Sequence, residues 1–342
     1  MQLLNTLYVT QQESYLRLEN STIKIEIDRE IKLQVPLHHL CSVVCFGHVA
    51  VSVPLMHRLA EEGVALVLFD ANGRFKARLE GAVSGNILLR QAQFSKAEDI
   101  SFALQMARSC LAGKIKNARN VLLRGAREAK SVEDELVLSA GAQHLAASLR
   151  TLSLMADIDA LRGVEGDAAK CYFSCLNALI RPDRREAFAF NGRTRRPPRD
   201  RMNALLSFLY SMLMNDCRSA IETVGLDPQL GFLHVVRPGR AALALDLMEE
   251  FRAFADRLAL TLINRGQIDP DDFIEREGGA VSLEGDARKA VVVAYQERKQ
   301  ETLMHPLLAQ PIAFGLVLLI QARIMARAIR GETEFYMPFT NK

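Results

Sequence analysis

The chain has 342 residues, more than a single hydrophobic core usually supports, so two domains are expected. Hydrophobic residues make up 49% of the sequence and charged residues 24%, a balance typical of a folded globular protein and not of a disordered chain. The net charge of +3 is too small to indicate nucleic-acid binding by itself. Any such function must depend on local clusters of positive charge.

The sequence contains no recognisable export or membrane signal. Residues 1–12 lack a basic start followed by a sustained apolar run, and the longest apolar stretch, residues 311–320, is too short to span a bilayer. The six cysteines include the pairs Cys41/Cys45 and Cys171/Cys175, which lack CxxC spacing and lie among apolar residues, so reduced thiols are expected. We therefore expect a soluble cytoplasmic protein with no membrane partner.

The first part of the chain has the pattern of short strands. Residues 23–27 alternate apolar and polar side chains, whereas residues 64–69 form a continuous apolar run typical of a buried strand. Residues 54–62 fit a short helix, and Asn72 with Gly73 favours a hairpin turn. We expect residues 1–94 to form a small, β-sandwich-like domain.

After residue 95, long segments with a 3.6-residue apolar period predict an all-α domain that extends to residue 342. The expected helices are 97–126, 132–161, 168–180, 200–224, 241–264, 286–304 and 311–330. The predicted fold class is therefore α+β, with a small β domain followed by a larger helical one.

A lone histidine, His234, precedes a helix that carries Asp246, Glu249 and Glu250. The spacing i, i+3, i+4 places these carboxylates along one side of the helix, so they need not lie in the core. Imidazole together with carboxylates suits Mn²⁺ or Mg²⁺ better than a structural zinc ion. A core histidine beside a solvated acidic face explains the same residues, so a metal site requires a third ligand.

A possible third ligand is Glu165, which stands between Gly163 and Gly166 ahead of an apolar helical face. Glycines at such positions let a neighbouring backbone or a ligand pass closely. Taken alone, the two glycines are better explained as helix caps, with Glu165 favoured near a helix N-terminus by the helix dipole.

The segment 181–201 has eight arginines against three acidic residues. Gly192, Pro197 and Pro198 indicate a loop, and Phe188 and Phe190 add aromatic surface, which together are typical of an arm that contacts phosphates and stacks on bases. A solvated surface loop is the alternative. No GxSxG, P-loop, GxGxxG after a strand or HExxH motif occurs, so hydrolase, nucleotide-binding and zincin chemistry lack their usual anchor.

Four ordered blocks of the sequence together resemble one family. They are Arg162-Gly163-Val164-Glu165-Gly166, the run from Arg196-Pro197-Pro198-Arg199-Asp200 to Tyr210, the run from Gly225-Leu226-Asp227-Pro228 to His234, and Leu245-Asp246-Leu247-Met248-Glu249-Glu250-Phe251-Arg252. The family is that of the CRISPR-associated integrases of spacer acquisition, the first universal Cas proteins, and the similarity is to the type I-C branch. It covers essentially the whole chain.

The resemblance implies an N-terminal domain that forms a homodimer and a helical domain with one Mg²⁺ or Mn²⁺ ion held by Glu165, His234 and Glu249, with Asp246 supporting the site. Glu249 stands where the family often has aspartate, which leaves the role of Glu250 open. The implied DNA contacts come from several arginines, namely Arg162, Arg193, Arg195, Arg196, Arg199, Arg237 and Arg240.

The implied reaction joins spacer DNA to a CRISPR array by attack of a 3′ hydroxyl on a phosphodiester at the leader–repeat or repeat–spacer boundary. The implied partner is a small ferredoxin-like adaptation protein. Two alternatives remain open from the residues: a stand-alone metal-dependent DNA nuclease or resolvase, and a non-catalytic DNA-binding scaffold.

Overall fold

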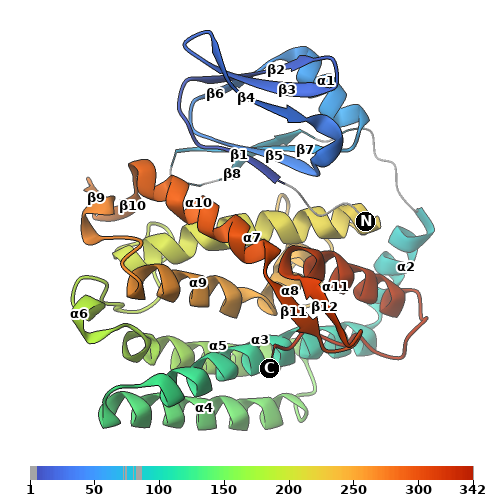
Figure 1. Cartoon of the computed structure of the whole chain (residues 1–342). Coiled ribbons are helices and arrows are strands. Elements are labelled where there is room, and N and C mark those ends of the chain that lie inside the picture. Colours follow the sequence, from blue (N-terminus) through green and yellow to red (C-terminus); the bar gives the residue numbers. More distant parts are fainter. Residues whose placement is uncertain (1–5, 72, 74, 80, 82–86, 342) are drawn as a thin grey trace. The chain divides into compact units, whose positions relative to one another are not determined.

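The computed structural model describes residues 6–71, 73, 75–79, 81 and 87–341, and the chain forms two compact units (Figure 1). One unit comprises residues 1–84 and 284–293, and the other comprises residues 85–283 and 294–342. Helix α2 (Ile87–Glu98) follows the first boundary, so the division expected between residues 94 and 95 falls inside this helix.

The first unit is built from two four-stranded sheets. Their strands, in chain order, are β1 (Thr6–Val9), β2 (Ser14–Glu19), β3 (Thr22–Ile27), β4 (Glu30–Pro36), β5 (Ser42–Phe46), β6 (Val49–Val51), β7 (Ala65–Phe69) and β8 (Phe75–Leu79). Helix α1 (Val53–Glu61) lies between β6 and β7 in the chain. One sheet has the order β4-β3-β2-β6 and the other the order β1-β5-β7-β8.

Burial in this unit follows the apolar pattern of the sequence. Ile23 and Ile25 of β3 point into the core, and every residue of β5 is buried, as the continuous apolar run requires. Strands β7 and β8 pair antiparallel as the hairpin prediction requires, although Asn72 lies outside the described residues. The predicted small β domain is thus confirmed.

The second unit is mainly helical. Its helices are α2, α3 (Ile100–Glu128), α4 (Val132–Leu152), α5 (Ile158–Ser174), α6 (Pro182–Arg185), α7 (Arg201–Val224), α8 (Ala242–Glu249), α9 (Arg252–Asn264), part of α10 (Gly285–Gln300) and α11 (Phe314–Ile329). It also carries two short hairpins that the periodicity did not predict, β9 (Phe273–Arg276) with β10 (Ala280–Leu283) and β11 (Thr302–His305) with β12 (Gln310–Ala313).

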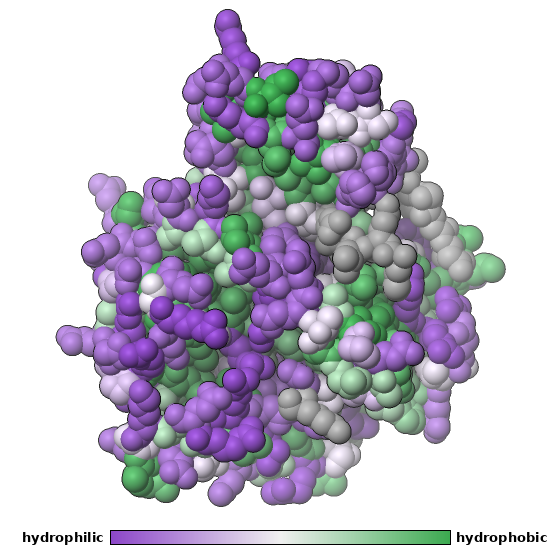
Figure 2. Space-filling view, viewed as in Figure 1, coloured by the Kyte–Doolittle hydropathy of each residue, from purple (hydrophilic) through white to green (hydrophobic). Residues whose placement is uncertain are grey.

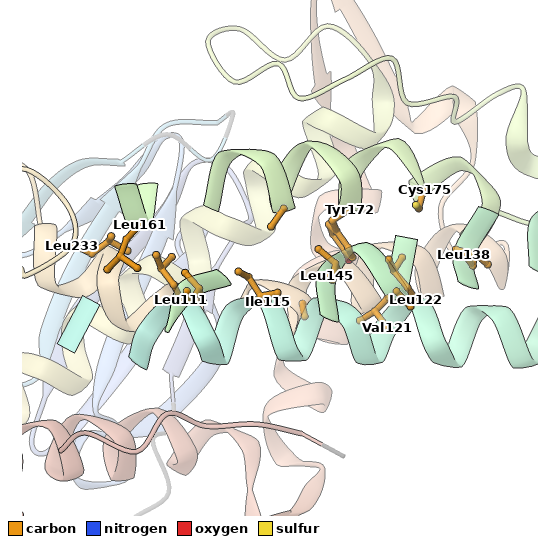
Figure 3. Packing of buried hydrophobic residues seen from close by; sticks show 14 of the residues in the cluster. Leu111, Ile115, Val121, Leu122, Leu138, Leu145, Leu161, Tyr172, Cys175 and Leu233 are labelled. Carbon is orange, nitrogen blue, oxygen red and sulfur yellow. The ribbon is translucent and has the colours of Figure 1, made fainter. Parts of the chain in front are cut away.

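Helices α3, α4 and α5 pack side by side around an apolar cluster (Figures 1 and 3). Leu111 and Ile115 of α3 contribute to it together with side chains from the two neighbouring helices. Leu161 and Leu233 belong to the same cluster and are almost fully buried. Because they are close in sequence to Glu165 and His234, respectively, the cluster fixes the backbone on which two of the predicted ligands lie.

Two of the expected long helices are interrupted. The helix expected over 132–161 ends at Leu152, and α5 begins after Asp157, whose carboxylate accepts a hydrogen bond from the Ala160 amide at 2.7 Å as an N-cap. The helix expected over 241–264 breaks between α8 and α9. There the Glu250 carbonyl accepts from the Asn117 side chain at 2.8 Å, a tertiary contact that periodicity does not reveal.

The surface of the helical unit is mostly hydrophilic, as expected when the apolar side chains lie in its core. Figure 2 shows hydrophilic residues over most of the visible face of the helical unit, with small hydrophobic patches between them. Among the described residues, no helix combines the length and the apolar character needed to cross a bilayer. All six cysteines are free thiols, which agrees with the absence of CxxC spacing.

Candidate metal and nucleic-acid site

The three predicted ligands line one pocket of about 330 Å³ in the helical unit. Glu165 comes from α5, His234 from the segment between α7 and α8, and Glu249 from the last turn of α8. The remaining lining residues are Lys114, Arg162, Arg195, Leu233, Val235, Arg240 and Arg252. The pocket therefore combines two carboxylates and an imidazole with five basic side chains.

The carboxylate of Asp246 sets the position of His234. Its Oδ1 accepts from the His234 Nδ1–H at 2.6 Å and from the His234 amide at 3.0 Å. Its Oδ2 accepts from the amides of Phe232 and Leu233 at 2.6 and 3.0 Å. A Cβ at Gly231 would lie 2.7 Å from that Oδ2, so only glycine lets the backbone approach this closely. With the proton on Nδ1, the Nε2 lone pair of His234 is available to the pocket.

Glu165 lies within α5 and not between two helices. Gly163 and Gly166 are helical residues, so the alternative that they cap helix ends is wrong. A Cβ added at either glycine would meet nothing within 4 Å. The helix surface beside Glu165, whose side chain is 29% exposed, is therefore bare and open to a ligand.

The three carboxylates of this helical segment are buried, although their spacing left them free to lie outside the core: Asp246, Glu249 and Glu250 expose 0%, 3% and 0% of their surface. Glu249 receives two hydrogen bonds from Arg252, at 2.8 and 2.9 Å, and an ion pair from Lys114 at 2.7 Å. Burial opposes its ionisation, but the two cations outweigh burial and lower the pKa of Glu249 well below its usual value.

Lys114 is a pocket residue to which sequence reasoning gave no role at the site. Its ammonium contacts Glu165 Oε1 and Glu249 Oε2, and so joins the two predicted ligands directly. His234 Nε2 is 3.7 Å from Glu249 Oε1 on the other side. The only sequence signal was the series of basic residues on the first long helix, which does not distinguish this lysine from its exposed neighbours.

Glu250 faces away from these ligands and binds the C-terminal segment. Its carboxylate accepts from the Tyr336 hydroxyl, from the Phe339 amide at 2.7 Å and from Gln321 Nε2 at 3.2 Å. Burial raises the pKa of Glu250 to about 8 in spite of these donors. The structure thus separates the roles of the two adjacent glutamates, since Glu249 lines the pocket and Glu250 secures the end of the chain.

The donor set suits a divalent cation in kind. Two carboxylates and an imidazole with a free Nε2 are the ligands that Mn²⁺ and Mg²⁺ accept. No group of three His, Cys, Asp or Glu side chains in the described part of the chain is gathered closely enough to hold a metal ion. Because Lys114 contacts both carboxylates, the site fits a divalent cation only when this ammonium has moved.

Two of the arginines predicted to contact DNA also have partners within the protein. Arg162 donates from Nε to the Leu233 carbonyl at 3.1 Å and steadies the segment that carries His234. Arg193 is largely buried and donates to Asn203 Oδ1 at 2.6 Å, and its guanidinium lies 5.3 Å from the centre of the Tyr210 ring. Both side chains therefore have a structural role, and their contact with DNA stays a prediction.

The remaining predicted arginines are accessible. Arg195, Arg196, Arg199 and Arg237 are exposed, and Arg240 is partly exposed. Arg195 and Arg240 line the pocket itself. Arg199 donates to the Gly278 carbonyl at 3.1 Å, which attaches the loop to the β9–β10 hairpin.

The prediction that Phe188 and Phe190 offer stacking surface to nucleic acid is wrong. They are 0% and 5% exposed. Phe190 stacks on Phe173, and Phe188 meets Phe273 edge to face. The two rings therefore anchor the arginine-rich segment to the helical core.

The fold and pocket define a class of protein in which a strand-rich N-terminal unit accompanies a helical unit with a mixed carboxylate and imidazole site. Residues 7–297 match the family described as CRISPR associated protein Cas1. A relative from Moorella thermoacetica, named CRISPR-associated endonuclease Cas1 1, is 54% identical over 98% of this chain and 98% of its own length. The chain belongs to the Cas1 family.

Solved structures share the fold. A chain of a Cas6-RT-Cas1–Cas2 complex superposes with a TM-score of 0.85 at 24% identity, covering 99% of this chain and 36% of that longer chain. A casposase bound to its integration product superposes with a TM-score of 0.82 at 20% identity, covering 97% of this chain and 93% of the casposase.

Proposed function

We propose that this protein is a metal-dependent DNA integrase and endonuclease that inserts spacer DNA into a CRISPR array. The observation that carries the proposal is the convergence of Glu165, His234 and Glu249 on one pocket rimmed by Arg195 and Arg240. The name of the Moorella relative, an endonuclease, and the casposase bound to an integration product support a reaction on DNA.

In this proposal, the side chains of the pocket have three different roles. Glu165, His234 and Glu249 would hold the divalent ion, which when bound supplies positive charge beside a scissile phosphate. Asp246 keeps the proton on His234 Nδ1 and so leaves Nε2 as an electron-pair donor. Arg195 and Arg240 bind and orient phosphate oxygens at the pocket rim.

The proposed joining reaction is a transesterification. A 3′ hydroxyl of the incoming fragment loses its proton and forms a new bond to phosphorus, while the bond from phosphorus to the departing 3′ oxygen breaks and that oxygen gains a proton. Water in place of the hydroxyl gives hydrolysis at the same site, which is how one pocket supports both an integrase and an endonuclease.

A joining assay tests this proposal with labelled DNA fragments that end in either a 3′ hydroxyl or a dideoxynucleotide. Glu165→Gln and His234→Ala should abolish joining and keep fragment binding, whereas the exposed controls Glu135→Gln and His144→Ala should leave joining unchanged. Cleavage that persists with blocked 3′ ends, without any joining of the free ends, would instead favour the stand-alone nuclease.

We further propose that the strand-rich unit forms a homodimer. Strand β4 is an edge of its sheet and exposes Ile31 and Leu33 by 42% and 49%, an apolar edge of the kind that proteins usually cover. Replacing both with lysine should convert the dimer to a monomer in sedimentation experiments. Unchanged mass would place the contact elsewhere.

For partners, we propose DNA and a small ferredoxin-like adaptation protein. The Cas1–Cas2 complexes among the structural relatives support an assembly of this kind. Because the reaction acts on chromosomal DNA, the cytoplasm is the proposed location.

A further inference from the structure

We propose that Lys114 is an internal counter-cation that closes the metal site in the metal-free protein and must leave before a divalent ion binds. This inference rests on the proposed function, since it concerns the same pocket. It assigns a role to a residue that lies on α3, far in sequence from the three ligands.

The first support is geometric. The Lys114 ammonium contacts Glu165 and lies 2.7 Å from Glu249 Oε2, so it joins one oxygen of each carboxylate. A divalent ion that used both carboxylates would need the space between those oxygens. The ammonium and the metal ion therefore exclude each other.

The second support is the balance of charge. Glu165, Glu249 and Asp246, which bonds to His234, contribute three negative charges, and Lys114 and Arg252 contribute two positive charges. With neutral His234, this group carries one negative charge. A dication added without loss of a cation would leave one uncompensated positive charge, whereas a dication that replaces Lys114 leaves the group neutral. Side-chain exposures of 4% for Glu249 and 16% for each cation mean that water screens this charge weakly.

The chemistry of the two cations indicates which one leaves. Arg252 donates two parallel hydrogen bonds to Glu249 from a rigid planar group, and it also lies 4.9 Å from the centre of the Tyr210 ring. Lys114 has a flexible four-carbon stem and makes one contact with each carboxylate. The pocket of about 330 Å³ offers the lysine head room to move. Lys114 is thus the cation that the metal ion displaces.

The consequence for binding follows from population arithmetic. If the site is competent only in the minor state with Lys114 displaced, the apparent dissociation constant is raised by the inverse of that population. Charge-assisted hydrogen bonds of this kind correspond to roughly tenfold or more in affinity. Removing the ammonium should therefore tighten metal binding.

The test measures Mn²⁺ binding to the full-length protein from the electron paramagnetic resonance signal of free Mn²⁺, without any DNA or turnover. Lys114→Met should bind Mn²⁺ roughly tenfold more tightly than the wild type. Lys114→Arg, which keeps the charge, should bind no more tightly than the wild type. Lys116→Met is the matched control, because Lys116 is exposed on the same helix, and it should leave affinity unchanged.

A second readout follows thermal unfolding in the presence of EDTA and of Mn²⁺. Without metal, Lys114→Met should melt below the wild type, because Glu165 and Glu249 then repel each other. Adding Mn²⁺ should raise its melting temperature by more than it raises that of the wild type. Lys114→Gln serves as a second neutral variant if the methionine variant does not fold.

The results of these measurements distinguish the counter-cation role of Lys114 from the proposed metal-dependent function. If Mn²⁺ binds the wild type but not Glu165→Gln, and neutral Lys114 variants bind with unchanged or weaker affinity, the counter-cation role is overturned while the proposed function stands. If neither the wild type nor any Lys114 variant binds Mn²⁺ in a Glu165-dependent manner, the metal site itself is absent and both proposals are overturned.

Discussion

Asp246 Oδ1 accepts the Nδ1 proton of His234 at 2.6 Å, and the same carboxylate receives three consecutive backbone amides. One buried side chain thus fixes the tautomer of the imidazole, its ring orientation and the path of the backbone that carries it. The carboxylate is 0% exposed, and its bonds to Phe232 and Leu233 lie in the low-dielectric interior, whereas His234, with 19% of its side chain exposed, faces the pocket.

Asp246→Asn should therefore damage both the site and the fold. An amide nitrogen cannot accept from the donors that face it, so we expect a loss of about 1–3 kcal/mol in the free energy of unfolding. We also expect Mn²⁺ affinity to fall roughly tenfold to 100-fold, since His234 loses its orienting partner. Urea unfolding and Mn²⁺ titration check these values. The exposed Asp271→Asn is the control, and wild-type metal affinity in Asp246→Asn would contradict the positioning role.

Alanine substitutions at Gly163 and Gly166 should have opposite effects on stability and on DNA binding. Both are helical, and a Cβ at either position meets no neighbour. Alanine at each should raise the free energy of unfolding by about 0.5–1 kcal/mol, because glycine is costly in a helix. If DNA passes over this bare surface beside Glu165, the same variants should weaken fragment binding and joining.

Thermal unfolding and fragment-binding titrations of the double alanine variant measure these two effects separately. Stabilised protein with full DNA binding would mean that the bare helix surface is not a contact. A lower melting temperature would mean that the alanine side chains clash with a neighbouring group and that the space beside the two glycines is not open.

The sequence predicted the positions of the helices and the residues of the pocket better than it predicted which side chains are buried and what they contact. Apolar periodicity located the helices, and the four blocks of resemblance singled out Glu165, His234 and Glu249, which do share a pocket. Burial of Glu249 depends on Lys114 and Arg252, whose approach is decided by how α3 packs against α8 and α9. Pattern along one helix contains no information about such contacts between helices.

The same limit explains the arginine-rich segment. Charge and aromatic content predicted an exposed arm, but Phe188 and Phe190 are buried and Arg193 is held by Asn203 and the Tyr210 ring. Composition reports which groups are present, whereas tertiary packing decides which of them reach water.

The C-terminal segment should depend on Glu250. Tyr336 donates its hydroxyl to this carboxylate and is itself buried, so Tyr336→Phe leaves the cavity filled but removes one donor. We expect a loss of about 1–2 kcal/mol in the free energy of unfolding, measured in urea, with metal affinity retained. Tyr15→Phe, at a half-exposed position, is the matched control. An unchanged midpoint in Tyr336→Phe would show that the other donors to Glu250 suffice.

Asp256 should make stability depend on pH. Burial raises its pKa to about 6, although the hydroxyls of Tyr210 and Tyr172 donate to it at 2.5 and 3.0 Å. The unfolded value is about 3.9, so the folded state holds a proton that the unfolded state has released. The contribution to stability is present in full below about pH 4, is lost as pH rises to about 6 and is constant above that range.

Asp256→Asn removes this titration. Between pH 4 and 6 the free energy of unfolding of the wild type should therefore fall relative to that of the variant, by at most about 1.4 kcal/mol per pH unit. Urea unfolding at pH 4, 5, 6 and 7 measures the difference. Parallel profiles for the two proteins would contradict the raised pKa, and the control Asp271→Asn should run parallel to the wild type.

The arginine-rich segment should bind DNA through its exposed members only. Arg195 and Arg196 are exposed, whereas Arg193 is committed to Asn203. Each phosphate contact contributes about 0.9 to the slope of log K against log salt concentration for duplex DNA. The double variant Arg195→Ala/Arg196→Ala should therefore bind more weakly and lower that slope by up to about two, with unchanged unfolding. Arg193→Ala should instead lower the midpoint of urea unfolding, because it removes the hydrogen bonds that the guanidinium donates to Asn203 and Ser207. Fluorescence anisotropy over a series of salt concentrations measures the slope, and an unchanged slope in the double variant would identify the segment as a solvated loop without phosphate contacts.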